Sequence, residues 1–149
     1  MLKVIPLFCN IQKLVLANCR LNSFIDIENC LESTGIVLLQ LNVSHNPIGL
    51  NGLYEIVKSK FLSNLTDLSA WDINIKSIKI QSPKKSYLSC LTNLNLSLNP
   101  ALNLEAFKNL IDAGVFSKVK ILTMQECFNC WSMLEESLSD LILIGKTTF

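Results

Sequence analysis

The stretch from Leu38 to Ile48 constrains the fold of this chain more than any other. It reads LLQLNVSHNPI, with further apolar residues at Leu41 and Val43 and an asparagine at Asn46. This spacing is too irregular for one face of a helix. It favours a short strand that turns sharply at the asparagine.

The pattern recurs along the chain, which indicates a repeat protein. Its turn position falls every 27, 27, 26 and 28 residues, at Cys19, Asn46, Ile73, Asn99 and Cys127. A fixed period of about 20 to 50 residues is typical of a solenoid, in which each repeat packs on its neighbours. We predict a single domain over 1–149, with an N-terminal edge at 1–10 and repeats at about 11–37, 38–64, 65–90, 91–118 and 119–144.

Amphipathic segments separate the predicted strands. Apolar residues at helical spacing predict helices over Ser23–Leu31, Asn51–Phe61 and Asn103–Ala113, and Gly35 and Gly114 follow the first and third as stop signals. Strand followed by helix, repeated, predicts an α/β fold with parallel strands and the helices outside. Helices are wider than strands, so the stack is expected to curve with its strands on the concave side.

These segments resemble leucine-rich repeats. The choice of Asn or Cys at the turn and the period near 28 are most similar to the ribonuclease-inhibitor-like class, over about residues 11–130. The resemblance implies a curved solenoid of about five repeats, with a parallel concave sheet and convex helices. It also implies recognition of other proteins. Some relatives inhibit ribonucleases or activate the Ran GTPase, and related repeats form the substrate-receptor part of ubiquitin ligases. Regulation of an enzyme, as an inhibitor or GTPase activator, and substrate reception for a ubiquitin ligase therefore remain the two alternative functions.

The remaining segments are less regular. Lys76–Ser89 is predicted to be a loop with at most a short helix near Tyr87. Met1–Cys9 is either an edge strand or the tail of a helix. Ser132–Ile144 is predicted to be a last helix, with a capping strand over Leu141–Ile144 as the alternative. Neither end carries an evident polar cap, so the chain is compatible with a segment of a longer solenoid.

The turn residues are predicted to be structural. An Asn or Cys after a strand can satisfy buried backbone groups of its own and the neighbouring repeat. We therefore assign a hydrogen-bonded ladder to Cys19, Asn46, Asn99 and Cys127. Ile73 cannot make such bonds. Cys127 and Cys130 form a C-x-x-C, but zinc would require a second pair at suitable spacing, and we predict no metal or cofactor.

The residues between the leucines are expected to face away from the core. Trp71 either anchors a partner, as tryptophans often do at the centre of interfaces, or folds over its neighbours and covers the core. His45 is expected at the rim and is poorly placed to act as a base for Ser44. The predicted partner-binding residues are Gln40, Asn42, Ser44, Asp67, Ser69, Trp71, Asn93 and Asn95.

The composition of the chain argues against several classes of function. The formal net charge of +1 gives no reason to expect binding to nucleic acid or to an anionic membrane. No apolar run approaches the roughly 18 residues of a membrane span. The six cysteines are scattered, which favours free thiols in an intracellular compartment, cytoplasmic or nuclear. Without a catalytic constellation, we predict a non-catalytic protein–protein interaction module.

Overall fold

A parallel sheet runs through the computed structural model, which describes residues 10–75 and 83–127 and the backbone of 142–144. Six three-residue strands pair with their neighbours in chain order. They are β1 (Lys13–Val15), β2 (Gln40–Asn42), β3 (Asp67–Ser69), β4 (Asn93–Asn95), β5 (Ile121–Thr123) and β6 (Ile142–Ile144). The prediction of an α/β chain with parallel strands is confirmed.

The strands pair in one register. The central residue of each strand is a leucine, and it lies opposite the leucine of the next strand. From β2 to β5 these leucines are at most 3% exposed, because alternation points them all toward the same side of the sheet. Their burial pins the register, since a shift by one residue would turn every leucine to the opposite face.

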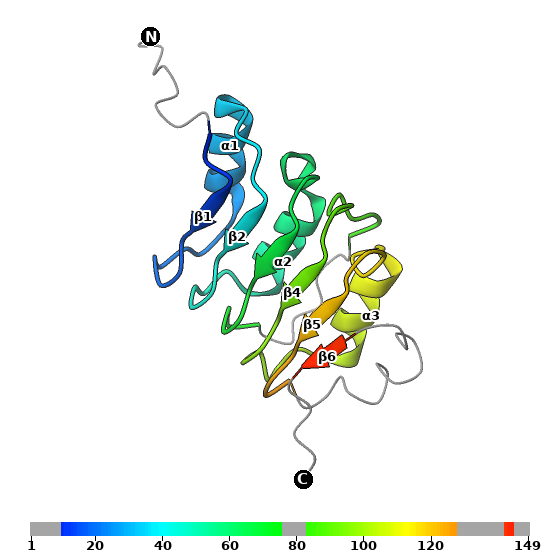
Figure 1. Ribbon diagram of the computed structural model, residues 1–149. Coiled ribbons are helices and arrows are strands. Elements are labelled where there is room, and N and C mark those ends of the chain that lie inside the picture. The colour runs from blue at the N-terminus through cyan, green and yellow to red at the C-terminus, as the bar shows by residue number, and fades with distance from the viewer. Residues whose placement is uncertain (1–9, 76–82, 128–141, 145–149) are drawn as a thin grey trace.

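Three α-helices lie on one side of the sheet (Figure 1). They are α1 (Ile25–Thr34), α2 (Gly49–Lys58) and α3 (Leu104–Asp112), and a short 3-10 helix, η1 (Lys60–Leu62), follows α2. All three overlap the predicted helices with shifted ends. Gly35 ends α1 in a left-handed conformation with φ of 66°, and its N–H donates to the Leu31 carbonyl, as expected for a glycine stop.

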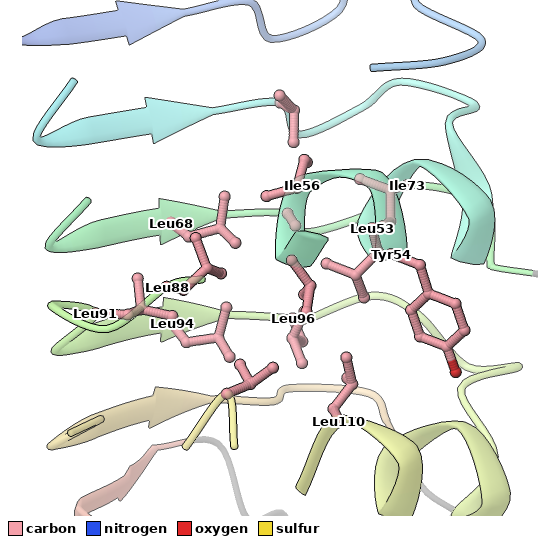
Figure 2. Close-up of a cluster of buried hydrophobic side chains, with 14 of the residues drawn as sticks. Leu53, Tyr54, Ile56, Leu68, Ile73, Leu88, Leu91, Leu94, Leu96 and Leu110 are labelled. Carbon is pink, nitrogen blue, oxygen red and sulfur yellow. The ribbon is translucent and has the colours of Figure 1, made fainter. Parts of the chain in front are cut away.

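The core fills the space between the sheet and the helices. Figure 2 shows Leu68 and Leu94 on the strands, and Leu53 and Ile56 of α2, within one apolar cluster. Each of these four side chains is at most 3% exposed. All three helices cover this side of the sheet. Among the described residues, no helix covers the opposite side (Figure 1).

The described part of the loop between β3 and β4, residues 83–92, connects two helices through its backbone. Residues 83–92 form turns without a helix, as predicted around Tyr87. The N–H of Ser86 donates to the carbonyl of Ala113, and that of Tyr87 donates to the carbonyl of Val57. The loop therefore joins the C-terminal ends of α2 and α3.

Several sequence-based predictions fall outside the described residues. These are the N-terminal edge at Met1–Cys9, the start of the loop at 76–82 and most of the last predicted helix at 128–141. The described end of that last segment is β6, so the alternative of a strand near Ile144 is the one observed. Within the described part of the chain, no helix is both long and apolar enough to cross a membrane.

Candidate functional site

The side of the sheet away from the helices forms an open groove with a volume of about 340 Å³. Side chains from five successive strands, β1 to β5, line it. Six of the eight predicted partner-binding residues are among them: Gln40, Asn42, Asp67, Ser69, Asn93 and Asn95. Ser44 and Trp71 lie just past the ends of their strands and do not line the groove.

Ser44 is predicted to face a partner, but it is buried in the structure, with 0% of its surface exposed. Its hydroxyl lies 2.9 Å from Oγ of Ser69 and accepts a hydrogen bond of 3.3 Å from the N–H of Trp71. Alternation predicts the direction of a side chain but not its exposure. Here the serine hydroxyl turns to Ser69 and to the backbone of Trp71, both on the next strand or just past its end.

Asn42 and Asn95 occupy equivalent positions and adopt equivalent hydrogen bonds. Oδ1 of Asn42 accepts from the N–H of Ser44 at 2.9 Å, and Oδ1 of Asn95 accepts from the N–H of Ser97 at 3.0 Å. Each side chain thereby supports the turn that follows its strand. Within the described part of the chain neither Nδ2 has a hydrogen-bond partner, so both remain donors available to a ligand.

Asp67 is already engaged within the groove. Its Oδ1 accepts from Nδ2 of Asn93 at 2.6 Å, and its Oδ2 accepts from Oγ1 of Thr66 at 2.7 Å. Lys13 at the β1 end is the other charged residue of the lining. The groove is thus polar but nearly neutral, and its carboxylate is stabilised by donors of the protein itself.

Trp71 belongs to a three-residue cluster at the rim. Its ring lies edge-on to the ring of His45, with centroids 3.9 Å apart and an angle of 66°. Nδ1 of His45 lies 2.7 Å from Oδ2 of Asp72. Trp71 remains partly exposed. Because His45 turns to Asp72 and the Ser44 hydroxyl is held by Ser69, the two neighbours form no nucleophile–base pair.

Asn46 makes five hydrogen bonds, three of which connect it to the segment that follows β1. Its Oδ1 accepts from the N–H groups of Cys19 and Leu21, both at 3.0 Å. Its Nδ2 donates to the carbonyls of Leu16, Val43 and Ser44. The residue is 1% exposed, and its bonds to the carbonyls of Val43 and Ser44 are fully buried.

The other ladder positions differ in how they bond. Asn99 makes the same kind of contacts, including acceptance from the N–H of Ile73. The Cys127 thiol donates to the carbonyl of Leu96 at 3.0 Å, and burial raises its pKa. Cys19 is exposed, and its thiol contacts only the nearby Ala17 carbonyl at 3.6 Å, so its backbone rather than its side chain joins the ladder.

Ile73 places an apolar side chain at the turn position that Asn46 and Asn99 fill with an amide. It is 0% exposed, and its side chain adds to the core. Its carbonyl accepts from the N–H of Gly49 at 2.8 Å. Gly49 adopts φ of 63°, a left-handed conformation that glycine takes without steric cost.

Five rim residues, each directly before a turn position, have positive φ between 51° and 58°. Sequence reasoning missed this conformation because the residue types share no common signal. Asn and Asp tolerate it, whereas a leucine does so at a cost. The five positions, spaced like the turn residues, are Asn18, His45, Asp72, Leu98 and Glu126.

Among the described residues, no three His, Cys, Asp or Glu side chains gather where they could hold a metal ion. Cys130, the second cysteine of the C-x-x-C, lies outside that part of the chain. Comparison of the chain with protein-family models, curated proteins and solved structures returned no match. The chemistry of the open face therefore provides the basis for a functional assignment.

Proposed function

We propose that this chain is a leucine-rich-repeat solenoid that binds a protein partner, without catalysis, on the open face of its sheet. The observation that carries the proposal is the groove of about 340 Å³, to which five successive strands contribute side chains. Repeat proteins of this kind offer an extended concave surface, and such surfaces are used for binding.

Two features support the solenoid of the ribonuclease-inhibitor-like class. Paired strands are offset by 27, 27, 26 and 28 residues from β1 to β5, which matches the sequence period. Asn46 and Asn99 connect neighbouring turns in the same way. We assign repeats to about 11–37, 38–64, 65–90, 91–118 and 119–144.

The chemistry of the groove favours a peptide or protein surface as the ligand. Its lining combines amides, hydroxyls and apolar atoms with the two charges of Lys13 and Asp67. A shallow, neutral and extended surface with amide donors is complementary to polypeptide backbone. Nucleic acid would require a basic surface, and the formal net charge of the chain is +1.

A pair of arginine substitutions tests the proposal. Gln40→Arg places a long cation in the groove, whereas Asn51→Arg makes the same exchange of an exposed amide on α2. Immobilised wild-type protein and both variants are incubated with cell extract, and captured proteins are identified and their affinities measured. We expect Gln40→Arg to weaken capture at least about tenfold and Asn51→Arg to preserve it. Equal capture by all three baits would exclude the groove as the binding surface.

A further inference from the structure

We infer that the partner segment bound in the groove is a polyproline II helix lying across the strands, an inference that rests on the proposed function. The two available amide donors carry it. Asn42 and Asn95 are the third residues of β2 and β4, and each Oδ1 is fixed by the backbone N–H two residues further on. The two Nδ2 groups are therefore held in the same way at two points of one row.

The spacing of these donors selects the conformation of the ligand. Strands β2 and β4 flank β3, so the two amides are separated by about 9.6 Å, twice the distance between neighbouring strands. A polyproline II helix repeats every three residues, or about 9.3 Å. Carbonyls on one side of an extended strand repeat at about 6.8 Å, which does not match. An α-helix uses its own carbonyls internally.

The space between the donors suits such a helix. Ser69 lies there on β3, and its small side chain is held by the Ser44 hydroxyl at 2.9 Å. Trp71 follows two residues later, partly exposed, with its ring fixed against His45. Aromatic surfaces beside hydrogen-bond donors are the common means of recognising proline-rich segments, because the polyproline II backbone is preformed and its carbonyls are unpaired.

The length and charge of the groove define the segment further. Side chains of β1 to β5 line it, so it spans four strand intervals, or about 19 Å. That length accommodates about six residues of a polyproline II helix. Asp67 at the centre already accepts from Thr66 and Asn93, so the central residues of the segment are expected to be uncharged. Lys13 at the β1 end favours an acidic residue there.

The test begins with selection of random twelve-residue peptides on immobilised wild-type protein. We expect enriched peptides to contain prolines spaced by three residues. The affinity of one such peptide is then measured by fluorescence anisotropy for Asn42→Asp and Asn95→Asp. Each carboxylate retains the acceptor for the turn N–H but has no N–H to donate, so about a tenfold loss of affinity is expected.

Asn51→Asp is the matched control, since it makes the same exchange at an exposed amide of α2 outside the groove, and it should keep the affinity within about threefold. Thermal midpoints verify that each variant folds. The affinities of Trp71→Leu and Trp71→Phe for the peptide provide a second readout, and a loss of affinity is expected only for the leucine variant. Enriched peptides without proline, or proline peptides insensitive to both Asp variants, would overturn the inference while leaving protein binding intact. Absence of any enriched peptide would also overturn it, and the Gln40→Arg capture experiment tests the proposed function separately.

Discussion

Oδ1 of Asn46 accepts a hydrogen bond of 3.0 Å from the backbone N–H of Cys19, which lies 27 residues earlier in the chain. This bond joins the turns that follow two adjacent strands. The loops could not bury their backbone groups without such partners, because an unpaired buried N–H costs about 1–3 kcal/mol. The stability of the stack therefore depends on contacts between residues that the sequence separates.

Asn46→Ala should lower the free energy of unfolding by about 1–3 kcal/mol, because five side-chain hydrogen bonds are lost at a residue that is 1% exposed. Urea unfolding followed by circular dichroism measures the change. Asn51→Ala on the exposed side of α2 is the control and should shift stability by less than about 0.5 kcal/mol. Equal effects of the two substitutions would contradict a role of Asn46 in stability.

Leu98→Asn should raise the free energy of unfolding by about 1 kcal/mol. Leu98 adopts φ of 54°, which is costly for a leucine, whereas the same conformation after β1 is taken by an asparagine, Asn18, with φ of 58°. The backbone bond from the N–H of Leu98 to the carbonyl of Gln125 does not depend on the side chain. Leu98→Val should have the opposite effect, since β-branched residues tolerate positive φ least. A lower thermal midpoint for the Asn variant would show that other contacts of Leu98 outweigh its backbone strain.

Glu55→Ala should loosen the start of α1 by about 1–2 kcal/mol. Oε2 of Glu55, on α2, accepts from the N–H of Phe24 at 2.7 Å and from the hydroxyl of Ser23 at 3.0 Å. The carboxylate thus caps a helix whose own cap residue has no side-chain bond. Hydrogen exchange of α1 amides measures the effect, and the exposed Glu32→Ala is the control. Unchanged exchange in the first turn would contradict the capping role.

Alkaline pH should destabilise the protein. Burial raises the pKa of the Cys127 thiol and of the Tyr54 hydroxyl above their ordinary values of about 8.5 and 10. The unfolded chain therefore loses these protons first, so the free energy of unfolding is highest below about pH 8.5 and falls as pH rises through the raised values. Urea titrations at neutral and alkaline pH measure the slope. Cys127→Ala should reduce the loss of stability at the lower end of the alkaline range. An identical slope of unfolding free energy against pH in that variant would assign the effect to other groups.

The period and the leucines determined much of the fold in advance. The leucines of β2 to β5 face the core because strand alternation is a local property, and the helices follow from apolar residues at helical spacing. The position of Asn46 and Asn99 directly after strands also predicted that they would bond to loop backbone. These features depend on residues close in sequence and on one repeating rule.

The open face was predicted in outline and corrected in detail. Gln40, Asn42, Ser69 and Asn95 lie in the groove, but Ser44 is enclosed. The sequence could not indicate this, because the burial of Ser44 depends on contacts with residues 25 to 27 positions away, such as Ser69. The contact of Trp71 with His45 depends likewise on a neighbour 26 residues away.

The sequence by itself determined the strand period, the helix positions and the side of the sheet that each leucine faces, since these follow from local backbone geometry. Only the tertiary structure decided which polar atoms of the open face remain available. Oδ1 of Asp67 accepts from Asn93 on β4, its Oδ2 accepts from the adjacent Thr66, and the hydroxyl of Ser69 bonds to that of Ser44. Nδ2 of Asn42 and of Asn95, in contrast, have no partner among the described residues. Hydrogen bonds between side chains far apart in sequence, such as that between Asn93 and Asp67, contribute to that selection, and they form only when the strands lie side by side.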